Sequence, residues 1–307
     1  MDGSPCPGIP MTIQFGSVLN FYASGSYQRR VGSDAFAMMS QSLVSKCVRA
    51  FSYVITTEIM DDFVKFPQTA DEIKILHDEL QQRFDYPGAF AFVDGSLIGL
   101  AAVSHLIEQV HVCRKSFHAI NTQFVCDVSM RFLSANARYP GSCHDALIWR
   151  ASLVNSTLRR ICNEMGEDWC YYLLADNGYP LQKWLLKPYD SPNTTQQQLY
   201  NKKHGKLRSL VERAIGLLKA RFRCLLLERK LRYDPVMSGY IIYANACTVL
   251  HNYLIGNNFP VDEIDPIFED YVIDSEQLED IEISYDDLQG GVEMRNEVAQ
   301  YFMGNSV

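Results

Sequence analysis

The sequence AFAFVDG occupies residues 89–95 and is an apolar run that ends in Asp94 and Gly95. A short apolar run bounded by a turn signal is typical of a strand buried on both faces of a sheet. Residues 117–126, 132–138 and 171–175 have the same character, and helical patterns surround them. The chain is therefore expected to be an α/β protein, with a mixed sheet flanked by helices.

The residues before this sheet are predicted to be helical from position 13 to 66. Ser40 is a suitable N-cap for a helix whose apolar residues recur at helical spacing between Leu43 and Ile55. A turn at 31–34 and a short helical segment at Phe36–Met39 are expected before it, which gives a helix-turn-helix layout. From the pattern alone, a small packing bundle without a nucleic-acid role is the preferred interpretation. Further helices are predicted near 144–149, 206–223 and 235–256.

Composition bounds the class of protein. The chain has 307 residues, of which 47% are hydrophobic and 21% charged, as expected for a soluble globular protein. Its nine cysteines are scattered and form no CxxC pair, which indicates a reducing compartment and argues against a disulfide framework or a structural zinc site. There is no long apolar run and no signal-peptide layout at the N-terminus, so an intracellular protein is expected.

Charge is unevenly distributed along the chain. The net charge is −8, but residues 261–287 contain twelve Asp and Glu and no Lys or Arg, so the remainder carries about +4. Residues 202–232 hold eleven Lys and Arg against two Glu, which suits a phosphate backbone. The whole acidic tail beyond Phe259 is expected to be loosely ordered. It either mimics DNA and covers the basic segment or keeps the protein soluble, and the second interpretation is preferred.

Three carboxylates have the spacing of a two-metal site. Asp94 and Asp176 are each predicted to end a buried strand, and Glu212 lies on a later helix, with thirty-five residues between it and Asp176. Mg²⁺ prefers oxygen ligands, and paired ions can clamp both reacting oxygens of a phosphodiester. Each acid also has a simpler explanation. Both aspartates suit turns, and Glu212 can pair with Arg208 one helical turn away.

The segment PGSCHD at 140–145 is a fourth candidate. Ser142 or Asp145 can cap the next helix, while His144 can serve proton transfer or contact phosphate. The neighbouring Cys143 has no orienting carboxylate at a recognisable position, so a Cys/His hydrolase is not supported. The sequence contains neither a Walker motif nor GxGxxG, so nucleotide-driven chemistry has no support.

In order and spacing, these motifs resemble the Harbinger transposase-derived nucleases, the PIF/Harbinger branch of the DDE endonucleases, from residue 15 to 258. The matching segments are VDG at 93–95, YPGSCHD at 139–145, LADNGYP at 174–180, LLKPY at 185–189 and GLLKARFRC at 216–224. Arg208, Glu212 and Lys219 match the spacing of the family's final motif. The segment FYASGSYQ at 21–28 is similar to the family's helix-turn-helix region.

The resemblance implies an RNase H-like fold and divalent-metal-dependent cleavage of DNA. Asp94, Asp176 and Glu212 would be catalytic and hold Mg²⁺ or Mn²⁺, with Asp145 as an additional candidate ligand and His144 as an auxiliary group. The implied phosphate contacts are Arg208, Lys219, Arg213, Arg221 and Arg223. The implied partners are double-stranded DNA and a separate Myb/SANT-like or MADF-like DNA-binding protein. A homodimer is compatible, no membrane is involved, and the expected location is the nucleus, with the cytoplasm as the other option.

The expected organisation has four parts: a flexible N-terminus (1–12), a helix-turn-helix-like region (13–85), an RNase H-like DDE endonuclease domain (86–258) and an acidic C-terminal tail (259–307). Leu97 stands where active relatives usually have a histidine, and residues 101–108 differ from the family's usual loop. The alternative is therefore a catalytically silent domesticated transposase that acts as a DNA- or protein-binding module. A cytosolic hydrolase of small phosphoesters is a third, weaker option.

Overall fold

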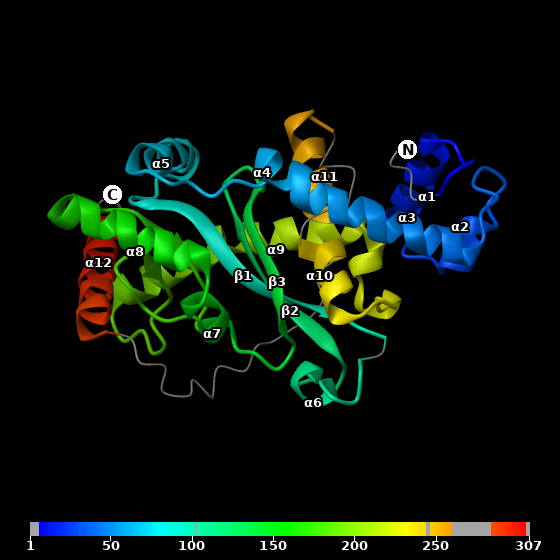
Figure 1. Ribbon diagram of the computed structural model, residues 1–307. Helices are drawn as coiled ribbons and strands as arrows, with labels where there is room; N and C mark the ends of the chain where they lie inside the picture. The colour runs from blue at the N-terminus through cyan, green and yellow to red at the C-terminus, as the bar shows by residue number, and fades with distance from the viewer. Residues whose placement is uncertain (1–5, 102, 244–245, 260–283, 305–307) are drawn as a thin grey trace.

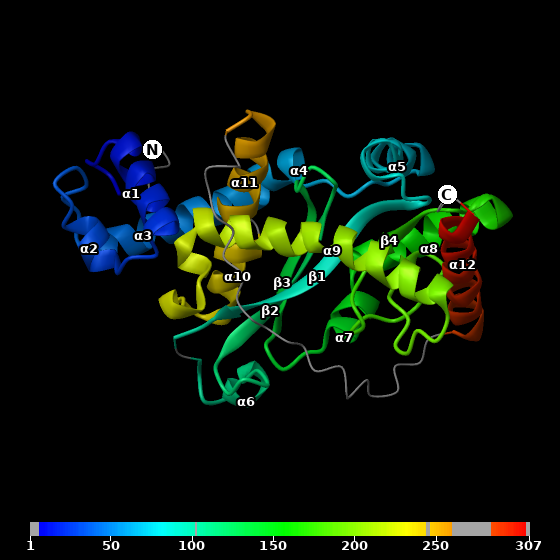
Figure 2. The same ribbon diagram turned by 180° about the vertical axis from the view of Figure 1, so that it is seen from behind.

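Five strands form one mixed sheet in the middle of the molecule (Figures 1 and 2). The computed structural model describes residues 6–101, 103–243, 246–259 and 284–304. The sheet order is β3-β2-β1-β4-β5; β1 is antiparallel to β2 and parallel to β4, β2 is antiparallel to β3, and β4 is parallel to β5. The strands are β1 (Ala89–Gly99), β2 (Ala119–Cys126), β3 (Phe132–Pro140), β4 (Tyr172–Leu174) and β5 (Leu185–Leu186).

The predicted strands are confirmed, but the expectation that Asp94 ends its strand was wrong. Strand β1 does not end there: it continues to Gly99 because residues 92–99 pair with β2, and Asp94 lies opposite Phe124. The Asp-Gly pair resembled a turn because glycine is rare inside strands. Asp176, by contrast, follows β4 as expected.

Helices cover both faces of the sheet. The long helix α9 (Thr195–Arg221) crosses one face, while α7 (Asp145–Arg150) and α8 (Leu153–Met165) lie on the other (Figures 1 and 2). Helix α5 (Ala70–Phe84) packs against β1, and the short α6 (Glu108–His111) lies in the connection from β1 to β2. Helix α9 begins before the expected residue 206, because Thr194 caps it by accepting a hydrogen bond from the Gln197 amide (3.2 Å).

The N-terminal region is helical, as expected, and extends from one end of the molecule toward its middle (Figure 1). It contains α1 (Met11–Ser24), α2 (Gln28–Gly32), α3 (Gln41–Val54), a π-helical segment η1 (Ile55–Ile59) and α4 (Met60–Phe63). Ser40 caps α3, since its hydroxyl accepts from the Leu43 amide (3.3 Å). The expected helix at Phe36–Met39 was wrong: Met38 has a φ of +47°, which a right-handed helix does not allow.

The chain after α9 forms two short 3₁₀ segments, η3 (Arg223–Leu225) and η4 (Leu227–Arg229), then α10 (Pro235–Tyr243) and α11 (Ala246–Gly256). The expected helix at 235–256 is thus two helices. Most of the expected acidic tail lies outside the described residues. Residues 285–304, however, form helix α12 (Tyr285–Gly304), which packs against α9 and buries Phe302 completely. The expectation of loose order was wrong there, because the local sequence is acidic but its apolar residues share one face.

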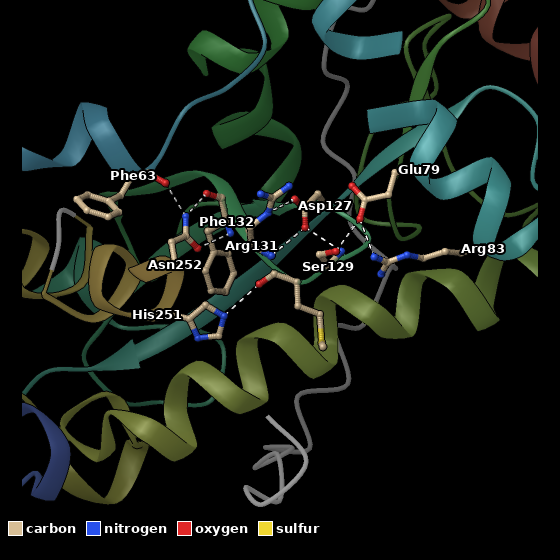
Figure 3. Close-up of polar contacts among 10 residues, drawn as sticks. Phe63, Glu79, Arg83, Asp127, Ser129, Arg131, Phe132, His251 and Asn252 are labelled. Atoms are coloured by element: carbon tan, nitrogen blue, oxygen red, sulfur yellow. Dashed lines mark hydrogen bonds and ion pairs between the residues drawn. The ribbon is translucent and has the colours of Figure 1, made fainter. Parts of the chain in front are cut away.

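Polar contacts fix the turn between β2 and β3 to the surrounding helices (Figure 3). Asp127 accepts from the backbone of Arg131 (2.9 Å) and from its guanidinium (2.8 Å). The Asn252 amide on α11 bonds both the N–H (2.8 Å) and the carbonyl (2.7 Å) of Phe132, and it also donates to the Phe63 carbonyl (2.8 Å). Helix α11 and the end of α4 are thereby held to the first residue of β3.

None of the described helices combines the length and apolar character that crossing a membrane would need.

Candidate active site

Arg208 joins two of the predicted acids. Its guanidinium donates from Nη1 to Oδ2 of Asp94 (3.1 Å) and from Nη2 to Oε1 of Glu212. Asp94 comes from β1 and is 8% exposed, whereas Arg208 and Glu212 lie one turn apart on α9. A helix face that crosses the middle of β1 therefore brings together residues that are 114 positions apart in the sequence.

Asp176 lies just beyond β4, beside β1 in the sheet. Its Oδ1 accepts from the Gly178 amide (3.0 Å), which fixes the loop after the strand. The preceding residue is also held, because His204 on α9 contacts the Ala175 carbonyl through Nε2 (2.8 Å). Asp176 thus lies on a short turn that two hydrogen bonds hold in place, one of them from α9.

Asp145 lies next to both aspartates. It is the first residue of α7, is 6% exposed, and accepts from the Asn121 side chain of β2 (2.9 Å). A Cβ on Gly95 would lie 2.5 Å from its Oδ1, so only glycine permits this close approach between β1 and α7. A Cβ on Gly178 would lie 3.2 Å from Asp176 Oδ1 and 3.8 Å from Asp145 Oδ2, so both carboxylates border that glycine.

Burial and mutual repulsion raise the pKa values of these aspartates. Burial raises the pKa of Asp94 to about 8; the Arg208 charge opposes this shift, and the carboxylates of Asp176, Asp145 and Glu212 add to it. Burial and the nearby Asp176 raise the pKa of Asp145 to about 6. Burial also raises the pKa of Asp176, against the effect of Arg208. Buried like charges close together make a site that attracts cations.

The donor set suits a hard divalent cation, since carboxylate oxygens are the ligands that Mg²⁺ and Mn²⁺ prefer. In the described part of the chain, however, no three His, Cys, Asp or Glu side chains converge closely enough to hold a metal ion. The carboxylates of Asp94 and Glu212 stay apart because the Arg208 guanidinium lies between them and supplies the positive charge. The residues therefore fit a divalent cation by chemistry, and Arg208 must move for Asp94 and Glu212 to share one.

The predicted phosphate-binding cations differ in exposure. Arg213 and Arg223 are exposed, while Arg208 and Arg221 are partly buried. Lys219 is only 2% exposed, so a phosphate can reach it only after local rearrangement. His144 occupies the N-cap position of α7 without a side-chain capping bond, and its Nδ1 lies 2.7 Å from Arg114 Nη2.

Two supporting residues were missed from the sequence. His204 and Asn121 touch Ala175 and Asp145, and both are buried. For His204 a signal existed, because it lies four residues before Arg208 and eight before Glu212, on the same helix face. For Asn121 there was none, since a polar residue within a strand does not reveal which side chain it will meet.

Comparison with known proteins assigns the family. Residues 93–252, which include all four acids, match the model of the "DDE superfamily endonuclease" family. The chain belongs to the DDE superfamily endonucleases. It is 32% identical to the Homo sapiens protein named "Putative nuclease HARBI1" over 237 residues, which cover 77% of this chain and 65% of that protein. The Rattus norvegicus protein of the same name is 31% identical over 274 residues, covering 88% and 75%.

A plant protein is also similar to this chain, at lower identity. The "Protein ALP1-like" of Arabidopsis thaliana is 26% identical over 230 residues, which cover 71% of this chain and 54% of that protein. The chain thus spans between about half and three quarters of the length of these relatives. No solved structure matches the fold significantly.

Proposed function

We propose that this protein is a transposase-derived, divalent-metal-dependent DNA endonuclease. The observation that carries the proposal is the meeting of Asp94, Asp145, Asp176 and Glu212 at the crossing of β1 and α9. Asp94, Asp176 and Glu212 lie around Arg208, and Asp145 lies beside Asp94 and Asp176; gathering these buried or half-buried acids carries a large cost in repulsion and desolvation. Such an arrangement is typical of a functional site rather than of a packing core.

The chain's residues have distinct roles in this proposal. Asp94, Asp176 and Glu212 hold the cations, and Asp145 is an additional ligand. Bound Mg²⁺ or Mn²⁺ would activate the attacking oxygen and stabilise the leaving one. Arg208 neutralises Asp94 and Glu212 until the cations arrive, and then becomes available to a phosphate. The exposed Arg213 on α9 and Arg223 in η3 contact the DNA backbone, Arg221 and the buried Lys219 join them after local rearrangement, and His144 is an auxiliary group.

We further propose that the fold is RNase H-like. The support is the sheet itself, in which three antiparallel strands are followed by two parallel ones in the order β3-β2-β1-β4-β5. The capped helix α3 after α2 supports a helix-turn-helix-like role for the N-terminal region. We also propose that the protein acts on double-stranded DNA in the nucleus, together with a separate Myb/SANT-like or MADF-like DNA-binding protein. A homodimer is compatible with this role. These points rest on the family resemblance alone.

The test is Mn²⁺-dependent nicking of supercoiled plasmid by the full-length protein. The wild type is expected to nick DNA, and Asp94→Asn and Asp176→Asn are each expected to abolish nicking. Asp168→Asn is a matched control, since Asp168 is exposed in the 3₁₀ segment η2 (Gly166–Asp168). Nicking that persists in Asp176→Asn would refute the assigned site, and no nicking by any preparation would refute the activity.

One observation favours a second candidate, a catalytically silent DNA- or protein-binding module. Arg208 holds Asp94 and Glu212 in ion pairs. If it never leaves, it serves as a permanent substitute for the cation. Isothermal calorimetry separates the two functions, because a silent module shows no Mn²⁺ binding that depends on Asp94.

A further inference from the structure

A second basic site lies outside the acid cluster, in a cavity of about 1020 Å³ between the N-terminal helices and the chain after α9. One wall is formed by α2 and α3, and the other by residues 228–233. We define this basic cavity by its six cationic lining residues: Arg29, Arg30, Arg49, Arg229, Lys230 and Arg232. Of the described residues that line it, Glu228 alone carries a carboxylate.

The walls are fixed to each other by close backbone contact. Gly25, at the end of α1, has a φ of +60°, and a Cβ there would lie 2.7 Å from the Arg223 carbonyl oxygen. Gln28 donates across the cavity to the Tyr233 hydroxyl (2.6 Å). The cavity is therefore a preformed feature of the fold rather than a loose gap between two regions.

Among the described residues, most of the cavity's cationic side chains have no carboxylate partner. Arg49 pairs with Asp234 (3.5 Å) and lies over the Tyr233 ring. Within the described part of the chain, no carboxylate forms an ion pair with the other arginines of these walls. Cations held close together without counter-charges repel each other, which raises the cost of folding unless an anion fills the site.

An aromatic ring accompanies these charges. Tyr27 lines the cavity and remains 63% exposed, although the Arg232 guanidinium lies 5.0 Å from its ring centre. A positively charged groove with an accessible aromatic side chain is the arrangement that binds single-stranded nucleic acid, because the cations follow the backbone and the ring stacks on a base. A duplex keeps its bases stacked inside, so it would not present one to a ring within a cavity.

We propose that the basic cavity binds a short segment of single-stranded DNA. The phosphates would lie against Arg30 and Arg232, and a base would stack on Tyr27. The choice of DNA rests on the proposed function, whereas the single-strand preference comes from the cavity's shape and its exposed ring.

The test is fluorescence anisotropy of a labelled oligothymidine, and of a duplex of equal length, with the full-length protein in EDTA so that no cleavage occurs. Arg30→Ala/Arg232→Ala is expected to weaken oligothymidine binding roughly tenfold and to make the slope of log affinity against log salt shallower by about 1.4. Tyr27→Ala is expected to weaken oligothymidine binding roughly tenfold and to leave duplex binding unchanged, while Tyr27→Phe keeps the ring and should bind like the wild type.

Lys65→Ala/Lys74→Ala is the matched control, because it removes the same charge from exposed positions away from the cavity. Equal affinity for the cavity and control variants would overturn the proposal, as would an equal loss on duplex when Tyr27 is replaced. Much tighter binding of oligouridine would overturn the DNA assignment. If the protein does not nick plasmid but the cavity variants lose oligothymidine binding as expected, the proposed function is refuted and the cavity site is supported. If the protein nicks plasmid but the cavity variants bind oligothymidine like the wild type, the cavity site is refuted and the proposed function is supported.

Discussion

Arg208 on α9 donates to Asp94 on β1 across 3.1 Å, and the same guanidinium bonds Glu212 one helical turn further along. A residue expected to contact phosphate thus balances the charge of two proposed catalytic acids. The carboxylates raise the pKa of Arg208 despite its burial, so it stays charged throughout.

Replacing Arg208 should weaken the fold and strengthen the response to metal. Arg208→Gln leaves Asp94 and Glu212 without their cation; because the arginine is partly exposed, we expect a loss of about 2 kcal/mol in unfolding free energy, below the full cost for a buried pair. Mn²⁺ should then raise the thermal midpoint more in the variant than in the wild type, because the ion takes the place of the guanidinium. Arg213→Gln, exposed on the same helix, is the control. An equal Mn²⁺ response in all three proteins would contradict the exchange.

The C-terminal helix should contribute to global stability. Phe302 is fully buried, with its ring 4.9 Å from that of Tyr86 and beneath the Lys203 ammonium. Phe302→Ala is expected to cost about 3 kcal/mol in urea unfolding. Tyr301→Ala next to it is the control, since that side chain is 37% exposed. Equal stability of the two variants would show that α12 does not unfold together with the sheet.

The side-chain amide of Asn252 should contribute strongly to the free energy of unfolding. Asn252→Ala leaves the N–H and carbonyl of Phe132 and the carbonyl of Phe63 without their partner (Figure 3). We expect a loss of about 3 kcal/mol, because each buried group that lacks a partner costs roughly 1–3 kcal/mol. Asn257→Ala, which removes one exposed hydrogen bond, should change stability by less than about 0.5 kcal/mol.

A buried histidine should make stability depend on acid pH. Burial, with help from the Arg221 charge, lowers the pKa of His251 to about 3, while the unfolded value is 6.5. The unfolded state therefore binds one more proton between pH 6.5 and 3, and stability falls as the pH falls through that window. His251→Gln keeps a donor for the Met130 carbonyl and should lower the slope by about 1.4 kcal/mol per pH unit. Identical slopes for variant and wild type would contradict a neutral buried ring.

Local patterns were enough to predict four of the five described strands, though not β5, and several of the helices. Residues 119–126 are buried along their whole length, and such apolar runs are recognisable because backbone pairing and burial act over a few neighbouring residues. The same reasoning failed at Gly95, read as a turn, and at α12, read as a tail. In both places the deciding contact is distant in sequence: pairing with β2 for the strand that continues through Gly95, and packing on α9 for the helix.

The sequence by itself determined the α/β class, the four acids and their family. Only the tertiary structure decided what those acids touch. Asp94 and Arg208 meet because α9 crosses β1, and no periodicity predicts a crossing. The basic cavity likewise depends on Gly25 meeting Arg223, which brings two basic segments roughly two hundred residues apart into one site. Charge and burial at such sites are sums over neighbours in space, and those neighbours exist only once the chain has folded.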